Sequence, residues 1–329
     1  MKNNTSTDPS SRPIPAPRCP RVLVTGGAGF VAAHLIRELE AGGHEVFTTD
    51  AVAPADGRTL PNFRQADLRD RDALAGLIRD VRPDACVHMG AISFVPDGDR
   101  DPSLLLGVNI AGTVNLLEAF RREKPDARVL FVSSAQVYGP APSVDEANVP
   151  VRENADTLPV SMYAISKVAG ERAAAAYAKV HGLSVMVARP ANHTGPGQTP
   201  RFVVPSFIRQ VLEIEAGKRS EMRVGNLRSV RDFTDVRDVV RAYRAILERG
   251  IAGQAYNVSA GVHVEIGALL ERIQALVGVR ASIVVDPALV RPADASIHLD
   301  VSRLRNVCGW TPRHTFDGTL RDMIASMRE

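Results

Sequence analysis

Cysteine is scarce in this 329-residue chain: the three cysteines stand far apart, at positions 19, 86 and 308. Their odd number and wide spacing argue against a disulfide framework, and the absence of a CxxC pair argues against a structural zinc site. We therefore predict no metal centre and a reducing, cytoplasmic location. The sequence also lacks a run of about eighteen consecutive apolar residues, so we expect no transmembrane helix and no membrane partner.

The chain also lacks a large excess of positive or negative charge. The formal net charge is +3, and Lys and Arg nowhere form a run of about five, which argues against a nucleic-acid partner. Hydrophobic residues make up 45% of the chain and charged residues 23%, which is typical of a globular protein and excludes a disordered chain or a coiled coil. Only residues 1–20, polar and proline-rich, are predicted to be a disordered tail. They contain no apolar stretch typical of a secretory signal.

From residue 21 onward, short β-branched runs alternate with amphipathic stretches. The runs predict strands at 21–26, 44–50, 85–91, 127–135 and 183–191, and the stretches predict helices at 30–42, 71–80, 103–122 and 160–181. Such alternation predicts repeated βαβ units, an α/β fold with a parallel sheet. After residue 190, proline and glycine break the pattern and indicate a second lobe. We predict one domain over 21–191 plus about 231–261, and a discontinuous lobe over about 192–230 plus 262–329.

A glycine-rich turn, TGGAGF, follows the first predicted strand and opens a helix. Gly26 permits a tight turn, and Gly29 lets the backbone approach the phosphates of a dinucleotide at the helix N-terminus. A glycine-rich βα turn also occurs for conformational reasons alone. Asp50 strengthens the nucleotide interpretation because it ends the second strand, where a carboxylate accepts both ribose hydroxyls. That carboxylate repels a 2′-phosphate, so NAD(H) is favoured, with NADP(H) possible.

Two further strand ends carry candidate cofactor contacts. Asp67 and Leu68 follow the segment NFRQ and could meet the adenine edge, although an exposed capping aspartate is an equal alternative. Small residues after the strand at 85–91 would pass beneath the cofactor; these are Met89, Gly90 and Ala91. We interpret His88, directly before them, as a structural histidine with satisfied hydrogen bonds.

Tyr163 and Lys167 stand four positions apart, and hence on one face of the predicted helix. The chain has only 5 tyrosines and five lysines, so chance rarely produces this pair. The lysine is expected to lower the pKa of the tyrosine toward the range of a general acid/base. Ser134 ends the strand at 127–135, where a hydroxyl can hold a substrate oxygen, and Ser133 is the neighbouring alternative.

Together, the segments TGGAGFVAAHL, SSAQVYG, YAISK and RDFTDVRD resemble the extended short-chain dehydrogenase/reductase family from residue 21 to residue 329. The resemblance implies a Rossmann-type, doubly wound domain that binds NAD(P) and a smaller C-terminal α/β lobe that binds a nucleoside-diphosphate sugar. It implies a homodimer packed through the helices near 103–122 and 160–181. It also implies catalytic roles for Ser134, Tyr163 and Lys167.

The same resemblance implies further contacts. Those to the cofactor are Phe30, Val31, Ala51, Asn109, Val132, Pro190, Asn192 and His193, besides the catalytic pair Tyr163 and Lys167. Those to the substrate are Ser93, Ser134, Asn192, Val203, Arg231 and Arg291. A guanidinium suits phosphate oxygens, although any single arginine can equally be a solvated surface residue. Asp232, Asp235 and Asp238 are better explained as helix-start and capping carboxylates than as metal ligands.

The type of reaction is narrowed by residues 135 and 136. Dehydratases of the family carry acidic residues directly after the serine or threonine, whereas this chain has Ala135 and Gln136, which cannot transfer a proton. The segments ARPANHTGPGQ and VGNLRSVRDFTDVRDVV resemble the branch that reduces GDP-4-keto-6-deoxymannose to GDP-D-rhamnose with NAD(P)H, although Ala191 replaces an expected phenylalanine. A nucleotide-sugar 4-epimerase is the alternative, and a non-catalytic NAD(P)-sensing protein is a remote one.

Overall fold

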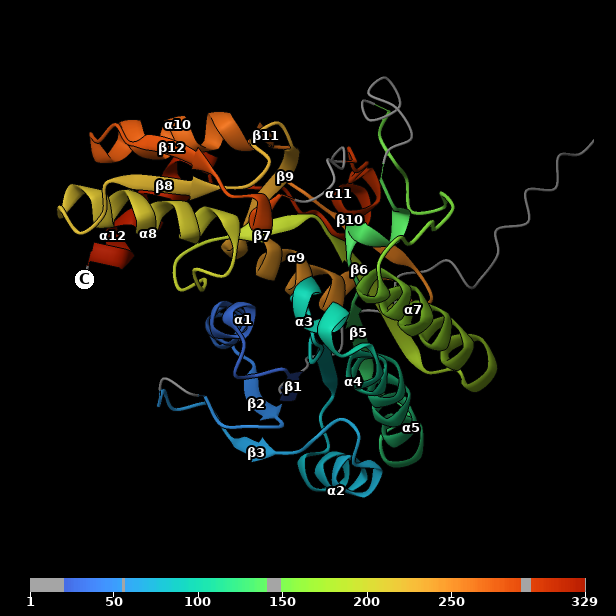
Figure 1. Cartoon of the computed structure of the whole chain (residues 1–329). Helices are drawn as coiled ribbons and strands as arrows, with labels where there is room; N and C mark the ends of the chain where they lie inside the picture. The colour runs from blue at the N-terminus through green and yellow to red at the C-terminus, as the bar shows by residue number, and fades with distance from the viewer. Residues whose placement is uncertain (1–20, 55–56, 141–148, 291–296, 329) are drawn as a thin grey trace, which may run out of the picture.

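A computed structural model describes residues 21–54, 57–140, 149–290 and 297–328 of the chain (Figure 1). The predicted tail at 1–20 and the predicted substrate contact Arg291 lie outside the described residues.

The larger part of the molecule is built on one seven-stranded sheet, and every pairing between its strands is parallel. Its strands, in spatial order, are β10 (Ala255–Val258), β6 (Ser184–Pro190), β5 (Arg128–Val132), β4 (Ala85–His88), β1 (Arg21–Thr25), β2 (Glu45–Asp50) and β3 (Phe63–Gln65). The chain runs from β1 outward to β3 and then returns to the other side of β1. This reversal between β1 and β4 is the switch point of a Rossmann-type sheet, as predicted.

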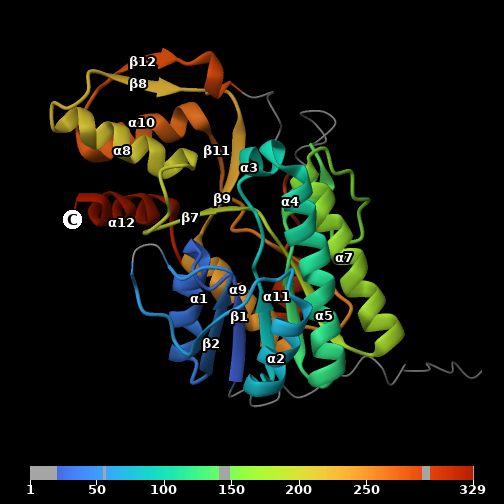
Figure 2. The same ribbon diagram turned by 60° about the horizontal axis from the view of Figure 1, so that its bottom comes forward.

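Helices cover both faces of this sheet. Side chains alternate along each strand, so Val22 and Val24 join one hydrophobic core and Leu23 joins the other. The first core is covered by α1 (Phe30–Ala41), α9 (Val236–Arg249) and α11 (Ser302–Cys308). The second is covered by α2 (Arg71–Val81), α5 (Gly112–Glu123) and α7 (Met162–His181). Figures 1 and 2 both show α5 and α7 side by side.

The predicted helix at 103–122 is continuous but not regular. It comprises α4 (Pro102–Leu106), a π-helical turn at Gly107–Ala111, and α5, and it is preceded by α3 (Val95–Arg100). A single wide turn within an α-helix often marks a functional site. The run Pro102–Glu123 is also long and apolar enough to cross a membrane, yet 44% of its most apolar stretch is buried inside the protein, as in the core helix of a globular domain.

The smaller lobe lies beyond one end of the large sheet (Figure 2). It contains a two-stranded parallel sheet of β8 (Glu221–Val224) and β12 (Ser282–Val285), with α8 (Val203–Glu215), α10 (Ile266–Val277) and α12 (Phe316–Arg328). A three-stranded sheet of β7 (Asn192–Thr194), β9 (Val230–Asp235) and β11 (His263–Glu265) connects the lobes.

Two segments near the predicted domain boundaries have contacts that can be stated. Strand β9 belongs to the connecting sheet, whereas α9 and β10 pack on or in the large sheet. Leu304, Cys308 and Trp310, which follow β12 in the chain, pack in the core under the large sheet. The domain boundaries themselves remain a prediction.

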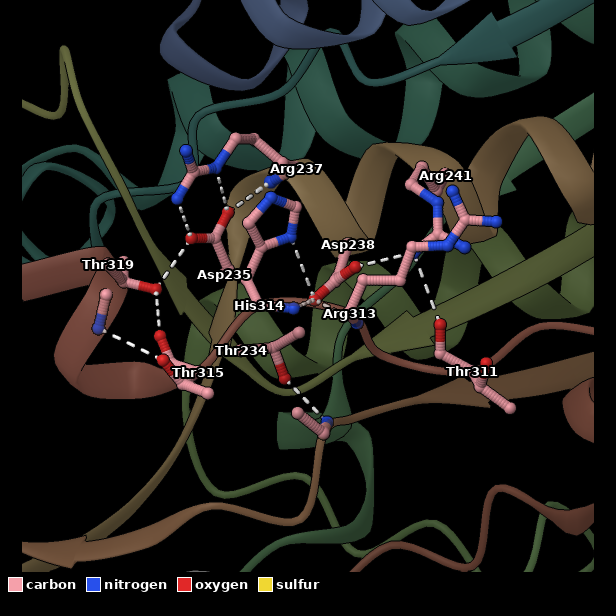
Figure 3. A network of polar contacts seen from close by, with 12 residues as sticks. Thr234, Asp235, Arg237, Asp238, Arg241, Thr311, Arg313, His314, Thr315 and Thr319 are labelled. Atoms are coloured by element: carbon pink, nitrogen blue, oxygen red, sulfur yellow. Dashed lines mark hydrogen bonds and ion pairs between the residues drawn. The ribbon is translucent and has the colours of Figure 1, made fainter. Parts of the chain in front are cut away.

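Two aspartates at the start of α9 fasten the C-terminal segment to the large sheet (Figure 3). Asp235 caps α9 by accepting the backbone N–H of Arg237, and it also accepts the hydroxyl of Thr319 at 2.6 Å. The fully buried Asp238 carboxylate accepts the backbone N–H groups of Arg313 and His314 at 2.9 and 2.8 Å. Asp238 is further paired with the guanidinium of its neighbour on α9, Arg241, at 2.6 Å.

The predicted role as helix-start or capping carboxylates therefore holds for Asp235 and Asp238, which are the N-cap and a first-turn residue of α9, but not for Asp232, which lies on β9. Asp235 is the cap, Asp238 binds the C-terminal segment, and Asp232 accepts the hydroxyl of Ser259 at 2.5 Å instead. Within the described part of the chain, no three acidic, histidine or cysteine side chains are arranged to hold a metal ion.

The variant Asp238→Asn should lower the free energy of unfolding by about 3 kcal/mol, because it leaves the Arg241 guanidinium without its buried counterion. The control Asp317→Asn removes an exposed partner of Arg272 and should change stability by less than about 0.5 kcal/mol. Urea unfolding of both variants tests this expectation. Equal, small losses would show that the buried carboxylate does not hold the C-terminal segment in place.

Candidate active site

The glycine turn lies against the end of β4, at the switch point of the sheet. Gly26 has a left-handed φ of +72°, and a Cβ built on it would stand 2.9 Å from the backbone nitrogen of Gly90. Gly29 forms the N-cap of α1, and Phe30 and Val31 begin the helix. Two backbones can approach this closely only where neither residue carries a side chain. This contact holds the glycine turn at the N-terminus of α1, and the pyrophosphate is predicted to bind at this turn, which we call the glycine cradle.

Asp50 ends β2 beside the glycine turn, where the adenosine of the cofactor is predicted. Its carboxylate accepts the backbone N–H groups of Ala28 at 3.0 Å and of Ala51 at 2.8 Å. Arg58, which was not among the predicted residues, donates its guanidinium to the carbonyls of Ala28 and Gly29. Asp50 and Arg58 thus bind opposite sides of the same turn. Nothing in the sequence pattern marks Arg58, because it stands in an irregular loop eight positions beyond the strand end.

Asp67 and Leu68 follow β3 but differ in environment. Arg69 binds the Asp67 carboxylate through two guanidinium nitrogens, at 3.1 and 2.6 Å, and lowers its pKa. The helix cap is not Asp67 but Asp70, which accepts two N–H groups at the start of α2. Leu68 is buried, and a Cβ on Gly90 would stand 2.9 Å from its Cδ1. Leu68 therefore packs beneath the loop after β4.

His88 links the cradle to the helical run above it. Its Nδ1 lies 2.7 Å from the Thr25 hydroxyl, which accepts the N–H of Gly90, and its Nε2 lies 3.0 Å from the Thr113 hydroxyl. Thr113 donates its own proton to the carbonyl of Asn109, so its oxygen accepts the Nε2 proton of His88. Burial and the charge of Lys167 lower the pKa of His88 to about 3. The histidine is neutral and satisfied, which confirms its structural interpretation.

Asn109 lies in the π-helical turn and is almost completely buried. Its amide accepts the N–H of Ile92 and donates to the Ile92 carbonyl and to the Ser166 hydroxyl. These bonds fix the loop that carries Met89, Gly90, Ala91 and the exposed Ser93 to helix α7. The wide turn thereby brings a polar side chain into an otherwise apolar helix contact.

The three predicted catalytic side chains meet beyond the carboxyl ends of β4 and β5. Ser134 follows β5, and Tyr163 and Lys167 lie in the first two turns of α7, capped by Ser161. All three are buried, with 9%, 9% and 4% of their surface exposed. The Lys167 ammonium donates to the carbonyl of Val132 at 2.9 Å and stands 5.7 Å from the centre of the Tyr163 ring.

The structure also distinguishes between the two serines. Ser133 turns away from Tyr163 and donates its hydroxyl to Glu171 at 2.6 Å. Ser134 faces Tyr163, and its hydrogen bond lowers the pKa of that phenol. Because neighbouring residues at a strand end point to opposite sides, only one serine can reach the site, and the geometry favours Ser134.

The pKa values differ in part from the sequence expectation. Burial raises the pKa of Tyr163 to about 12, more than the Ser134 hydrogen bond lowers it. The prediction that Lys167 brings the tyrosine pKa down toward neutrality is wrong here, because loss of solvation dominates. Burial also lowers the pKa of Lys167 to about 8, against an opposing effect of the Glu171 charge. At neutral pH the site therefore contains a protonated phenol beside an ammonium.

The remaining predicted contacts lie around the connecting sheet. Pro190 ends β6, while Asn192 and His193 form β7, and burial lowers the pKa of His193. Val203 begins α8, and Arg231 lies on β9 with its guanidinium bonded to the carbonyl of Val230. These residues stand at the lobe junction beyond the triad, and their ligand contacts remain predictions.

Comparison with known proteins agrees with this geometry. Residues 23–323 match the profile of the family described as GDP-mannose 4,6 dehydratase. The chain is 36% identical to GDP-6-deoxy-D-mannose reductase of Pseudomonas aeruginosa, across 93% of this chain and 96% of that protein.

Two solved structures share the fold. RMD from Pseudomonas aeruginosa complexed with NADPH superposes with a TM-score of 0.81 at 35% identity, covering 93% of this chain and 98% of that one. UDP-glucose 4-epimerase of Thermus thermophilus in complex with NAD gives 0.83 at 31% identity, with coverage of 94% and 99%. With its Rossmann-type sheet, glycine cradle and Ser, Tyr and Lys side chains, the chain belongs to the GDP-mannose 4,6 dehydratase family of extended short-chain dehydrogenases/reductases.

Proposed function

We propose that this enzyme reduces the C4 ketone of a nucleoside-diphosphate 4-keto-6-deoxy sugar, with GDP-4-keto-6-deoxymannose as substrate and GDP-D-rhamnose as product. The observation that carries the proposal is the meeting of Ser134, Tyr163 and Lys167 beside the Gly26 cradle. A phenol with a pKa of about 12 retains its proton at neutral pH and is suited to protonating a developing alkoxide. The similarity to GDP-6-deoxy-D-mannose reductase favours this substrate.

The residues present fit a nicotinamide dinucleotide. A side chain at Gly26 or Gly90 would force the glycine turn away from the end of β4, so only glycines keep the backbone N–H groups of the turn and of the start of α1 available to a dinucleotide. Asp50 would accept the adenosine ribose hydroxyls, which favours NAD(H). Arg58, on the other side of the same turn, supplies a positive charge near that end and leaves NADP(H) possible. The bound nicotinamide would supply the hydride.

In the reduction, the protein orients the sugar and moves one proton. The Ser134 hydroxyl donates a hydrogen bond to the C4 oxygen, and Tyr163 gives its proton to that oxygen as negative charge develops. The Lys167 ammonium stabilises the phenolate that remains, and it would also hold the nicotinamide ribose of a bound coenzyme. Ala135 and Gln136 follow Ser134 in a short helical turn and provide no acid or base for elimination of water. The site therefore lacks the groups that a dehydratase would need there.

Purified protein supplied with GDP-4-keto-6-deoxymannose should oxidise NADH or NADPH, measured by the loss of reduced-nicotinamide absorbance. Tyr163→Phe should lower kcat by about 10²- to 10⁴-fold, because it removes the proton donor. The control Tyr177→Phe, on the same helix but bonded to Glu118, should retain activity. Comparing the two coenzymes also tests the preference assigned to Asp50.

A 4-epimerase is the second candidate, favoured by the similarity to the UDP-glucose 4-epimerase of Thermus thermophilus. An epimerase would interconvert C4 epimers without net coenzyme consumption. Lack of coenzyme oxidation, with NAD retained on the isolated protein, would therefore replace the reductase proposal by this one. Full biological activity of Tyr163→Phe would instead favour a non-catalytic NAD(P) sensor.

The value of kcat/KM for reduction should fall as pH rises through about 8, because Lys167 loses its proton above its lowered pKa. Tyr163 stays protonated across this range and should add no limb below its pKa of about 12. In Lys167→Arg the guanidinium keeps its charge, so the alkaline limb should disappear from whatever activity remains. A wild-type profile that stays flat through pH 8 would show that the protonation of Lys167 does not control kcat/KM.

We further propose a cytoplasmic homodimer, formed through α4, α5 and α7 of each copy. The proposal is supported by large apolar side chains exposed on α4 and α7; Leu104 is 40% exposed, Ile165 41% and Val180 71%. Sedimentation should give about twice the 35.4 kDa chain mass. Ile165→Glu should shift the equilibrium toward monomer, whereas Ile251→Glu, at another exposed site, should not. A monomeric wild type would contradict the proposal.

A further inference from the structure

A buried ion pair lies behind the catalytic side chains. Glu171 is on α7 and Arg189 on β6, and their side chains are 9% and 8% exposed. The Arg189 guanidinium binds both carboxylate oxygens, with Nε at 2.9 Å from Oε1 and Nη2 at 2.6 Å from Oε2. This is the bidentate geometry in which arginine and carboxylate bind most strongly.

The rest of the network satisfies both members of the pair. Glu171 also accepts the hydroxyl of Ser133, and Arg189 donates to the Tyr138 hydroxyl at 2.8 Å and to the carbonyl of Glu153 at 3.0 Å. The Tyr138 hydroxyl in turn donates to Asn257 on β10 at 2.7 Å. A buried ion pair generally contributes little net stability compared with apolar residues of the same volume. Its position beside the active site is therefore the feature that requires explanation.

The pair is connected to the catalytic residues through the end of β5. Lys167 donates to the carbonyl of Val132, and Glu171, one turn further along α7, accepts the hydroxyl of Ser133. The N–H of Ser133 donates to the carbonyl of Ala188 on β6 at 2.8 Å. The peptide that precedes Ser134 is thus held from α7 at two points and from β6 at a third. These bonds fix the direction in which Ser134 leaves the strand.

Glu171 is also the anion whose charge raises the pKa of Lys167. The charged or titratable groups that act on the ammonium are Tyr163 and Glu171 on α7 and His88 on β4, and Arg189 on β6 is bonded to Glu171 behind them. His88 is neutral and Tyr163 protonated near pH 7, so neither supplies negative charge. Burial lowers the pKa of Lys167, and the charge of Glu171 opposes that effect.

We propose that Glu171 is a positioning residue of the active site: through Ser133 it sets the orientation of Ser134, and through its charge it keeps Lys167 protonated, with Arg189 as its counterion. This inference rests on the proposed function, because that function gives Lys167 and Ser134 their roles in turnover. The titration of Lys167 is independent of any substrate.

The first experiment measures the Lys167 titration directly in the full-length protein. Lysine labelled with ¹³C at Cε gives few signals, because the chain has five lysines, and Lys167→Met assigns the one of interest. We expect Glu171→Gln to move the Lys167 pKa about one unit below its wild-type value of about 8. Glu171→Asp should recover part of the shift. An unchanged Lys167 pKa in Glu171→Gln would overturn the electrostatic half of the proposal.

A double variant serves as the control for folding, because it removes both buried charges together. Glu171→Gln leaves Arg189 as an unpaired buried cation, whereas the double variant Glu171→Gln with Arg189→Gln leaves no buried charge in the pair. The double variant lacks the Glu171 charge as well, so its Lys167 pKa should also fall. If both the single and the double variant fold with a wild-type Lys167 pKa, Glu171 has no electrostatic role.

A second variant separates orientation from charge. Ser133→Ala keeps both members of the ion pair but removes the link between Glu171 and the strand end. It should lower kcat by about tenfold with little change in KM, while the Lys167 titration stays in place. Wild-type kcat in Ser133→Ala would overturn the orientation half. If the enzyme proves inactive as a reductase, the kinetic arm is repeated on epimerisation, and the Lys167 titration still decides the electrostatic half.

Discussion

The bidentate contact between Glu171 and Arg189 is the interaction on which the catalytic geometry depends. It joins helix α7 to strand β6, and through Ser133 it also holds the end of β5. Tyr163 and Lys167 lie on α7, and Ser134 follows β5, so the relative positions of these elements decide whether the three side chains meet. Because the pair is buried and fully bonded, any shift of α7 along the sheet would break charged hydrogen bonds in a medium of low polarity. The arrangement is therefore rigid where the chemistry requires precision.

The cofactor cradle depends on a different constraint, which is the absence of side chains. Gly26 and Gly90 meet at the switch point of the sheet, and the Thr25 and His88 side chains support them from below. With a pKa near 3, His88 does not change charge in the neutral range, so this support is insensitive to pH. Lys167, by contrast, has a pKa lowered to about 8 and changes charge just above neutrality.

Much of this structure follows from local sequence patterns. Helix and strand positions, the glycine turn and the spacing of Tyr163 and Lys167 are encoded within short segments, and the sequence predicted them. Interactions between distant segments left no such pattern. Glu171 and Arg189 are eighteen positions apart on different elements, and Arg58 reaches the glycine turn from an irregular loop. The predicted lowering of the Tyr163 pKa was wrong for a related reason. Helical spacing reveals a neighbouring charge but not the degree of burial, which raises that pKa.

The attachment of the C-terminal segment has a consequence for how the protein is made. Helix α9 packs in the core of the large sheet, but Asp238 is bonded to Arg313 and His314, and Trp310 fills the same core. These residues are synthesised after all seven strands of the sheet that they help to cover. The core under the large sheet consequently cannot be completed when its own strands have been made, and it has to wait for this later segment. A chain shortened before residue 302 would lose Leu304, Cys308 and Trp310 from that core, together with helix α12 of the smaller lobe.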